Sequence, residues 1–439
     1  EVNIEKVPLK EGGLAPWEIW VSESQERFML VVRPKNLGAV MQIFKKWDVE
    51  ATVIGRVIEA RTLRISFKGR KIFEMELDFL TAGPEYCRAY EIRKREEREA
   101  TFKEPEDYNR ILLEILSSPN VCSKEWAIRQ YDHEVRASTV VKPLQGMIGK
   151  YTHGDAAVIK PLESSFVGLA ISSDVNPSFM NIDAFWGAAS AIDENCRNLA
   201  SVGATPHSFV DCLNFGSPER AAVLGDFHEA CRGLGHMASS LGIPFVSGNV
   251  SFYNETADGA IPPTPTILGI GVVPDIRRCV TVELKKAGNP LYLLGDTKDE
   301  IGGSEYAKLL KIESTRVPET DADVLKRRMA MLIRAIRRGY VAACHDVSEG
   351  GAAVCLAEML LGGDLGATIN IEAMGSLRPD IKLFSESNTR WIAEVKKSEE
   401  KNFERVFGGE RIYKIGVVKG KDLGIRDGAR LLVHLSNDA

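Results

Sequence analysis

A pattern that occurs twice constrains the fold of this chain more than any other feature. Residues 21–27 read VSESQER and residues 384–390 read FSESNTR, and their first serines are 363 positions apart. Two flanking matches follow the same order at nearly the same spacing: Asn3-Ile4-Glu5 with Asn370-Ile371-Glu372, and Ile54-Gly55 with Ile415-Gly416. Matches in a fixed order with small insertions and deletions indicate an internal repeat. We therefore expect two copies of one fold.

The two copies are unequal in length. The second copy has a long upstream part, roughly residues 119–367, whereas the matching region of the first begins at residue 1. We therefore expect the chain to start inside a domain, with the missing piece either removed or supplied by a separate polypeptide. Between the copies, residues 91–110 are rich in charges of both signs, which is typical of a solvated linker or an exposed helix.

Composition excludes several classes of protein. With 439 residues, 44% hydrophobic, the chain can form two to four domains with substantial cores. A net charge of −5 argues against a general nucleic-acid or anionic-membrane binder. Eight cysteines without a CxxC pair indicate buried thiols in a reducing, cytoplasmic compartment. No apolar run is long enough for a membrane span, and the N-terminus has no signal-peptide character.

The rest of the chain alternates between strand and helix patterns. Strands are expected at residues 166–174, 208–215, 243–247 and 290–296. Helices are expected at residues 183–202, ending at Gly203, and at residues 221–241. This alternation predicts an α/β class.

Two groups of polar residues are candidates for a site. Asp211 lies on an apolar strand, where an acid is costly unless it is paired or binds something. SGNVSFYN (247–254) follows another strand, and its Gly248, Asn249 and Ser251 form a short polar loop suited to phosphate and Mg²⁺. The alternative is a polar turn that satisfies its own backbone.

The second group is dispersed in sequence. Glu194 and Asn198 are four residues apart and share a helix face, while Asp174 ends a strand and Asp346 lies in HDVSEGG (345–351). Together they could form an oxygen-ligand cluster for Mg²⁺, although each alone is more typical of a cap or a surface residue.

Two further features are weak. Gly302-Gly303-Ser304 precedes a helix and could bind phosphate, or be a plain loop. His133 is more typical of a hydrogen-bonding residue than of a catalytic base. No Ser-His-Asp pattern, HExxH or GxGxxG is present.

The longer motifs resemble a known family. SESQER, DCLNFGSPE, VSGNVSFYNE, GGSEY and HDVSEGG are similar to the synthetase subunits of phosphoribosylformylglycinamidine synthase, within the aminoimidazole ribonucleotide synthetase-like superfamily. The resemblance covers nearly the whole chain. It implies tandem units, each with an N-lobe that contributes a barrel-forming sheet and an α/β (α+β) C-lobe.

Mapped onto this plan, the domains are the truncated end of the first C-lobe (1–90), a charged linker (91–118), the second N-lobe (119–277) and the second C-lobe (278–439). The resemblance places no catalytic residue in this chain, because the family's catalytic histidines and most magnesium carboxylates belong to the missing first N-lobe. It therefore implies that the chain is inactive alone.

The implied activity is a carbon–nitrogen ligase of purine biosynthesis. It converts formylglycinamide ribonucleotide to the amidine with ATP, Mg²⁺ and ammonia from glutamine. By resemblance, Glu23, Ser24, Gln25 and Ser251 contact the ribonucleotide, Asp211 and Gly248 contact ATP, and Asn249 holds Mg²⁺. Asp174, Glu194, Asn198 and Asp346 match an auxiliary magnesium site that could hold an ADP or ATP.

The resemblance also implies partners: a polypeptide with the missing first N-lobe, a separate glutaminase subunit and a small bridging subunit. Two alternatives stay open. One is another enzyme of the superfamily, such as a selenophosphate synthetase, a thiamine-monophosphate kinase or the aminoimidazole ribonucleotide synthetase; the internal repeat argues against these single-unit proteins. The other is a non-catalytic nucleotide-binding scaffold chain of the same complex.

Overall fold

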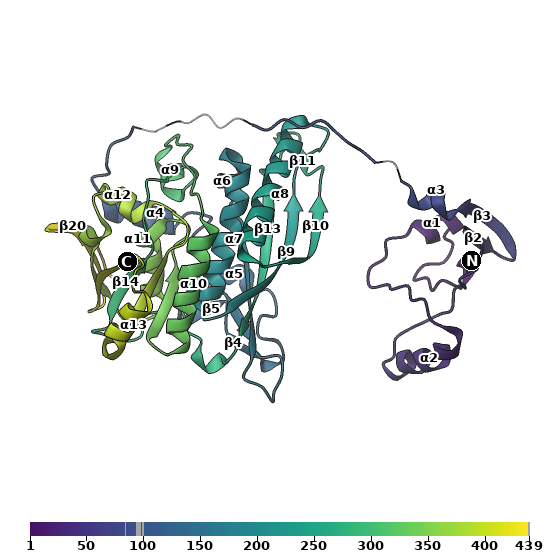
Figure 1. The fold of residues 1–439 in the computed structure, drawn as a ribbon, viewed down its shortest axis with the longest axis horizontal. Coiled ribbons are helices and arrows are strands. Elements are labelled where there is room, and N and C mark those ends of the chain that lie inside the picture. The colour runs from purple at the N-terminus through teal and green to yellow at the C-terminus, as the bar shows by residue number, and fades with distance from the viewer. Residues whose placement is uncertain (84, 94–97, 99–100, 438–439) are drawn as a thin grey trace. The chain divides into compact units, whose positions relative to one another are not determined.

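The computed structural model describes residues 1–83, 85–93, 98 and 101–437. It divides into two compact units, Glu1–Cys87 and Arg88–Ala439 (Figure 1). The predicted α/β class is confirmed, because both units combine helices with sheets of mixed strand direction. No helix among the described residues is long and apolar enough to cross a membrane.

The first half of the larger unit is built on a six-stranded sheet. In spatial order its strands are β10 (Phe245–Ser251), β9 (Thr205–Asn214), β13 (Thr264–Val273), β8 (Gly168–Asp174), β7 (Ala157–Ile159) and β4 (Thr139–Val141). Burial alternates along β13, as expected for a sheet with one covered face. The sheet is open, with β10 and β4 at its edges.

Two long helices, α7 (Ala184–Ser201) and α8 (Ala221–Leu241), lie against the covered face of this sheet (Figure 1). The Asp183 carboxylate caps α7 by accepting from the Trp186 amide. Gly203, just beyond the helix, has a φ of +84°, so the predicted end of this helix is confirmed. Smaller elements complete this half: α5 (Glu125–Ile128), η3 (Val135–Ala137), β5 (Leu144–Met147), β6 (Lys150–His153), α6 (Pro177–Ile182), β11 (Glu255–Thr256), β12 (Gly259–Ala260) and η4 (Ile276–Arg278).

The second half has a seven-stranded sheet. Its spatial order is β15 (Val341–Asp346), β17 (Trp391–Val395), β14 (Pro290–Leu294), β18 (Ile412–Val418), β16 (Ala367–Asn370), β19 (Leu423–Asp427) and β20 (Arg430–Leu435). Strands β14 and β17 are buried along their whole length, because helices cover both faces.

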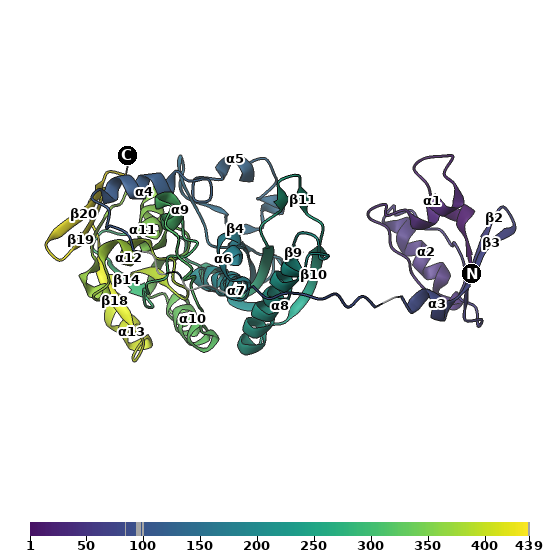
Figure 2. The same cartoon turned by 90° about the horizontal axis from the view of Figure 1, so that it is seen from above.

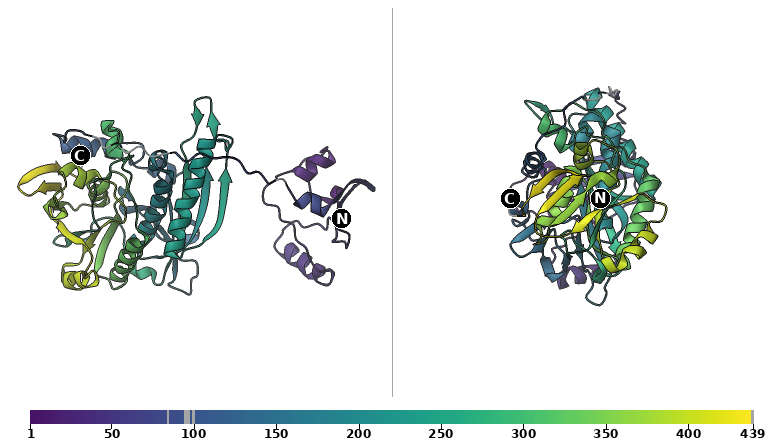
Figure 3. Two further views of the ribbon diagram at one scale, coloured as in Figure 1. Left: turned by 45° about the horizontal axis from the view of Figure 1, so that its top comes forward. Right: turned by 90° about the vertical axis from the view of Figure 1, so that its left-hand side faces the viewer.

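The two faces of this sheet belong to different cores. One core contains α4 (Tyr108–Leu116), α11 (Gly351–Leu361) and α12 (Pro379–Phe384), and α9 (Glu305–Leu310) packs beside them. The other core contains α10 (Ala322–Arg337) and α13 (Glu400–Val406) together with α7 and α8, so it joins the two halves (Figure 2). The hairpin of β19 and β20 lies at the end of the unit away from β10 (Figures 2 and 3). Short η5 (Ile371–Met374) lies between β16 and α12, and η6 (Lys397–Glu399) lies between β17 and α13.

Helix α4 lies within the expected linker of residues 91–118. Its Tyr108, Ile111, Leu112 and Ile115 are buried in the same core as α11. Their periodic spacing gives the helix an apolar face that must be covered. The part of this segment around α4 is therefore structural, while residues 94–97 and 99–100 lie outside the described residues.

The smaller unit has a three-stranded sheet and a small core. Ile4, Ile19 and Ile65 form that core. Its elements are β1 (Val2–Asn3), η1 (Ile4–Lys6), α1 (Pro16–Val21), η2 (Pro34–Asn36), α2 (Leu37–Lys46), β2 (Thr62–Phe67), β3 (Arg70–Glu76) and α3 (Leu77–Thr81).

The internal repeat is also present in the hydrogen bonding. In both copies the two serine hydroxyls of SES bond each other, and the arginine that ends the motif donates to the carbonyl of the first serine. These distances are 2.8 and 2.7 Å in the first copy and 3.1 and 2.6 Å in the second. The residue before the arginine, Glu26 or Thr389, has a left-handed φ of 59° or 57°.

The glycines of the repeat have one physical role. A Cβ on Gly55 would lie 2.2 Å from the Glu1 carbonyl oxygen, and a Cβ on Gly416 would lie 2.3 Å from that of Thr368. Both contacts are far too short, so only glycine allows the two backbone segments to approach this closely in each copy. The repeat therefore conserves a close backbone contact as well as a motif.

The SES segments themselves are loops in both copies. Residues 22–27 follow α1 and residues 385–390 follow α12 as loops, since a helix ends at the start of each motif and a left-handed residue turns the chain. In the second copy the apolar run after the loop is β17, held between β15 and β14. In the first copy Phe28 and Met29 are 92% and 74% exposed, and residues 28–33 form no strand.

This difference predicts unequal effects of equivalent truncations. Ile392→Ala on β17 removes a fully buried side chain and should lower the free energy of unfolding by about 2–5 kcal/mol. Met29→Ala, 363 positions earlier, should change it by less than about 0.5 kcal/mol. Urea unfolding of the 439-residue chain measures both, and equal losses would contradict the exposed state of residues 28–33.

Candidate functional site

Buried carboxyl groups gather where the two halves of the larger unit meet. Asp174 ends β8, Glu194 projects from α7, and Asp346 ends β15. Glu349 follows in the turn before α11 and acts electrostatically on both Asp174 and Glu194. The two sheets thus each end at the cluster, and α7 lies between them.

Hydrogen bonds hold Asp174 in place. Its Oδ1 accepts from Asn198 Nδ2 at 2.6 Å, and its Oδ2 accepts from Asn195 Nδ2 and Ser172 Oγ, each at 2.7 Å. Gly269 makes room for Asn195, because a Cβ there would lie 1.7 Å from Asn195 Oδ1. The sequence-predicted pair Asp174 and Asn198 is therefore in direct contact.

Two amide oxygens in this network are buried without a partner among the described residues. They are Oδ1 of Asn195 and Oδ1 of Asn198. A buried acceptor without a donor or a cation costs about 1–3 kcal/mol. Asn198 contacts the Asp174 carboxylate through its Nδ2, so the oxygen atoms that this group of residues offers fit a hard cation such as Mg²⁺.

The electrostatics also favour a bound cation. Burial raises the pKa of Asp174 to about 7 and that of Asp346 to about 7. Burial, together with repulsion from Glu349 and Asp174, raises the pKa of Glu194 well above its ordinary value. The carboxyl groups repel one another, and a divalent cation would relieve this repulsion.

Arg197 supplies part of the compensation. Its guanidinium is 1% exposed, donates from Nε to Asp346 Oδ2 at 3.2 Å and also bonds Asp193. Arg197 also lowers the pKa of Glu194, but burial and repulsion from Glu349 and Asp174 outweigh this effect. The cluster therefore keeps an excess of acidic groups.

His345 forms a second link between the two halves. Its Nδ1 lies 2.5 Å from Asp155 Oδ1 and its Nε2 lies 2.9 Å from Glu358 Oε2. Burial alone would lower the pKa of His345, but Asp155 and Glu358 raise it well above its ordinary value. His345, Asp155 and Asp346 are close enough to share a metal ion. An imidazolium with both nitrogens engaged is a poor ligand, so this trio is better read as a structural link.

The other predicted group lies on strands β9 and β10. Gly248 pairs with Asp211 and Asn249 pairs with Cys212. A Cβ on Gly248 would lie 2.5 Å from both Asp211 carboxylate oxygens, so glycine admits this carboxylate. Burial raises the pKa of Asp211, while a backbone hydrogen bond from Asn249 lowers it.

The expectation that Gly248, Asn249 and Ser251 form a loop is not met, because β10 runs to Ser251. Side chains alternate along a strand. Asp211 and the Gly248 position therefore share one face of the sheet, whereas Asn249 and Ser251 share the other. Strand β10 is an edge strand and Asn249 is exposed.

The predicted substrate loop belongs to the smaller unit. Glu23, Ser24 and Gln25 are exposed on the loop after α1. The two units are not placed relative to each other, so the structure does not bring this loop together with Asp211 or Asn249.

Two weaker features have structural roles. The Glu305 amide lies at the start of α9, directly after Gly302-Gly303-Ser304, and donates to Glu386 at 2.8 Å. This amide is therefore already bonded to a carboxylate of the protein and is not free to bind a phosphate. His133 Nδ1 lies 3.2 Å from the Tyr131 carbonyl oxygen, in keeping with a hydrogen-bonding residue.

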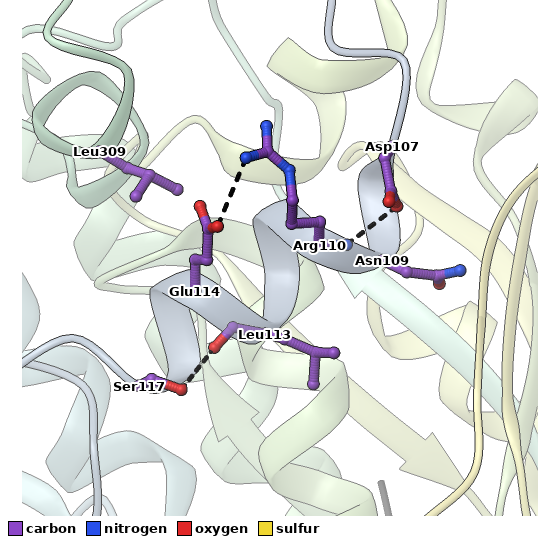
Figure 4. A pocket seen from close by; sticks show the side chains of 7 residues that line it. All are labelled: Asp107, Asn109, Arg110, Leu113, Glu114, Ser117 and Leu309. Carbon is purple, nitrogen blue, oxygen red and sulfur yellow. Dashed lines mark hydrogen bonds and ion pairs between the residues drawn. The ribbon is translucent and has the colours of Figure 1, made fainter.

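A hollow along α4 is unrelated to either group (Figure 4). Its polar side chains are used locally: Asp107 caps the helix, and Arg110 contacts Glu114 at 3.5 Å.

The sequence did not identify Glu349, Glu386, Asp193 or Arg197. Glu349 is the second acidic residue of the HDVSEGG motif that contains Asp346, so the motif could have indicated it. Glu386, Asp193 and Arg197 matter because they are buried in the folded chain, and no local sequence pattern predicts that burial.

Comparison with known proteins assigns the chain to a family. Residues 153–273 match the N-terminal domain of AIR synthase related proteins, and residues 1–68 and 286–427 both match the C-terminal domain. These matches cover well over half of the chain, which therefore belongs to the AIR synthase related protein family. The match of one domain to both segments agrees with the internal repeat.

Curated relatives match along the whole chain. It is 37% identical over 438 residues to phosphoribosylformylglycinamidine synthase subunit PurL of Thermoplasma acidophilum, covering 100% of this chain and 57% of the relative. It is 39% identical over 451 residues to the subunit of the same name from Moorella thermoacetica, covering 99% and 59%. The chain thus spans less than two thirds of the length of these relatives.

Solved structures show the same fold. T. maritima PurL complexed with ADP matches with a TM-score of 0.64 and 20% identity, covering 95% of this chain and 59% of that chain. PurLQS from Thermotoga maritima matches with a TM-score of 0.62 and 21% identity over the same shares.

The raised pKa values predict a pH dependence. Between pH 3.8 and about 7 the folded chain keeps protons on Asp174 and Asp346 that the unfolded chain has lost. In metal-free buffer these groups should therefore make the free energy of unfolding fall as pH rises through that window, by roughly 4 kcal/mol each, at about 1.4 kcal/mol for each pH unit of the window. Urea unfolding across the window measures the slope. Asp174→Asn should make the slope less negative than in the wild type, and an unchanged slope would contradict the raised pKa.

Proposed function

We propose that the chain is part of an ATP-dependent phosphoribosylformylglycinamidine synthase. This carbon–nitrogen ligase converts formylglycinamide ribonucleotide to formylglycinamidine ribonucleotide in purine biosynthesis, with ammonia from glutamine. The observation that carries the proposal is the 37–39% identity, over essentially the whole chain, to subunits of that name. The oxygen-rich residue groups at Asp211 and Asp174 are in keeping with a nucleotide and Mg²⁺.

In the proposed reaction, ATP phosphorylates the formamide oxygen and ammonia then displaces phosphate. Bound Mg²⁺ would neutralise charge on the phosphoryl group. Asp211 and Gly248 are proposed to contact ATP, Asn249 to hold Mg²⁺ and Ser251 to contact the ribonucleotide. Since these residues of β9 and β10 lie on both faces of the sheet, the ligands would reach all of them only across the exposed edge at β10.

The smaller unit is proposed to supply Glu23, Ser24 and Gln25 to the ribonucleotide. The exposed apolar side chains of this unit indicate that another part of the assembly covers them. Trp20 and Val21 are 41% and 61% exposed, whereas Leu383 and Phe384, 363 positions later, are fully buried beside α11. We propose that an N-lobe like that of residues 119–277 covers these faces and brings the catalytic residues. A glutaminase subunit and a small bridging subunit would complete the complex.

The direct test mixes the chain with a polypeptide that carries such an N-lobe and follows ATP- and ammonia-dependent amidine formation. Asp211→Ala and Asn249→Ala should each lower the rate by about 100-fold or more, since each removes a group at a charged transition state. Asn402→Ala on α13 is the matched control and should keep the rate. Full activity of both variants would contradict the assignment of Asp211 and Asn249 to the active site.

The alternative is a scaffold chain that binds a nucleotide without catalysis. It is favoured by one observation: the cluster of Asp174, Glu194, Asn198 and Asp346 is formed within the larger unit alone. The proposed ligand there is an auxiliary ADP or ATP with Mg²⁺, held by these four residues.

The auxiliary site predicts stabilisation by ligand. MgADP at 100 times its dissociation constant should add about 2.7 kcal/mol to the free energy of unfolding and raise the melting temperature by several degrees. Asp174→Asn should abolish that shift while leaving the Asp211 site intact. A shift of equal size in the variant would place the bound nucleotide elsewhere.

A further inference from the structure

The loop of residues 385–390 uses its first polar groups inside the second half of the larger unit. Glu386 accepts from the backbone amides of Glu305 and Gly350, each at 2.8 Å, and so joins the starts of α9 and α11. Ser385 Oγ donates to the Lys298 carbonyl at 2.7 Å. These groups fix the loop to its own sheet.

The next two residues cross to α7. Asn388 accepts from Arg197 Nη1 at 3.1 Å and donates to Ser190 Oγ at 2.8 Å. Thr389 donates to Asp193 twice, from its backbone amide at 2.9 Å and from Oγ1 at 2.6 Å. Both ends of the Asn388 amide are therefore occupied.

Asp193 is the centre of this junction. It is fully buried, directly precedes Glu194, and accepts from Arg197, Thr389 and Thr320. The loop leads straight into Trp391, whose partner across the β17–β15 ladder is Asp346. Trp391 Nε1 also donates to the Arg197 carbonyl at 3.1 Å. The bonds at Asp193 thus link the helix of Glu194 and Asn198 to the loop before β17, and β17 pairs with the strand of Asp346.

We infer that Asp193 is a positioning residue for the proposed cation and nucleotide site. By binding Thr389 it fixes α7 against β15, and so sets the spacing between Glu194 and Asn198 on one side and Asp346 on the other. The inference rests on the proposed auxiliary site. It has a consequence for specificity: with Asn388 held by Arg197 and Ser190, the second SES loop is a structural joint that does not contact a ribonucleotide.

Two isosteric substitutions separate positioning from simple stability. Thr389→Val removes the hydroxyl bond that reaches Asp193 from the loop, and Thr320→Val removes the hydroxyl bond that reaches the same Oδ2 atom from the segment before α10. Titration calorimetry of the 439-residue chain with MgADP should show about tenfold weaker binding for Thr389→Val and near-wild-type binding for Thr320→Val. Both variants should melt at similar temperatures.

Equal weakening in the two variants, or none in Thr389→Val, would overturn the positioning role. Hydrogen–deuterium exchange is a measurement that needs no ligand. Thr389→Val should speed amide exchange of residues 184–201 more than Thr320→Val does. Equal exchange rates in the two variants would contradict the role of Thr389 in joining the loop to α7. If the wild type binds no MgADP, the proposal of an auxiliary nucleotide site is wrong. The exchange result then decides by itself whether Asp193 joins the loop of residues 385–390 to α7.

The specificity claim has its own titration. Formylglycinamide ribonucleotide added to the wild-type chain should show no binding that depends on Asn388. Saturable binding that Asn388→Ala removes would show that the second loop contacts a ribonucleotide.

Discussion

The larger unit depends on one buried ion-pair network on α7, in which Arg197 lies between Asp193 and Asp346. Burying charges costs several kcal/mol per ion unless each is paired and hydrogen-bonded. Asp193 and Arg197 are compensated in this way, whereas Asp174 and Glu194 remain acidic groups with raised pKa values. Apolar residues of similar volume would fill the same space more cheaply, so retention of this excess negative charge is in keeping with a cation that binds there.

The same loop has different surroundings in the two copies. Both SES loops keep the serine–serine and arginine–carbonyl bonds and the left-handed residue. The second copy also contacts α9, α11 and α7. The motif therefore encodes a local backbone shape, and the neighbours decide whether its side chains act as joints or face a ligand.

Periodicity predicted the elements that are long and regular. The helices at residues 183–202 and 221–241 and the strand at 208–215 follow from apolar spacing and from Gly203. Short elements were less certain: β10 extends through polar Ser247–Ser251 because it pairs with β9, and no local pattern reports that pairing. Asp174 and Asn198 were predicted together and do meet, but Asp193, Glu349 and Glu386 owe their importance to tertiary burial, which a single sequence does not display.

Electron paramagnetic resonance of the chain with Mn²⁺, an oxygen-seeking substitute for Mg²⁺, tests the central claim most directly. At a pH above the value of about 7 for Asp174 and Asp346, the account predicts a saturable Mn²⁺ site with oxygen ligands only. This site should be lost in the double variant Asp174→Asn/Asp346→Asn and kept in Asn249→Ala. Unsaturable binding, or a Mn²⁺ signal that the double substitution leaves unchanged and Asn249→Ala removes, would contradict the assignment of the carboxylate cluster as a cation site.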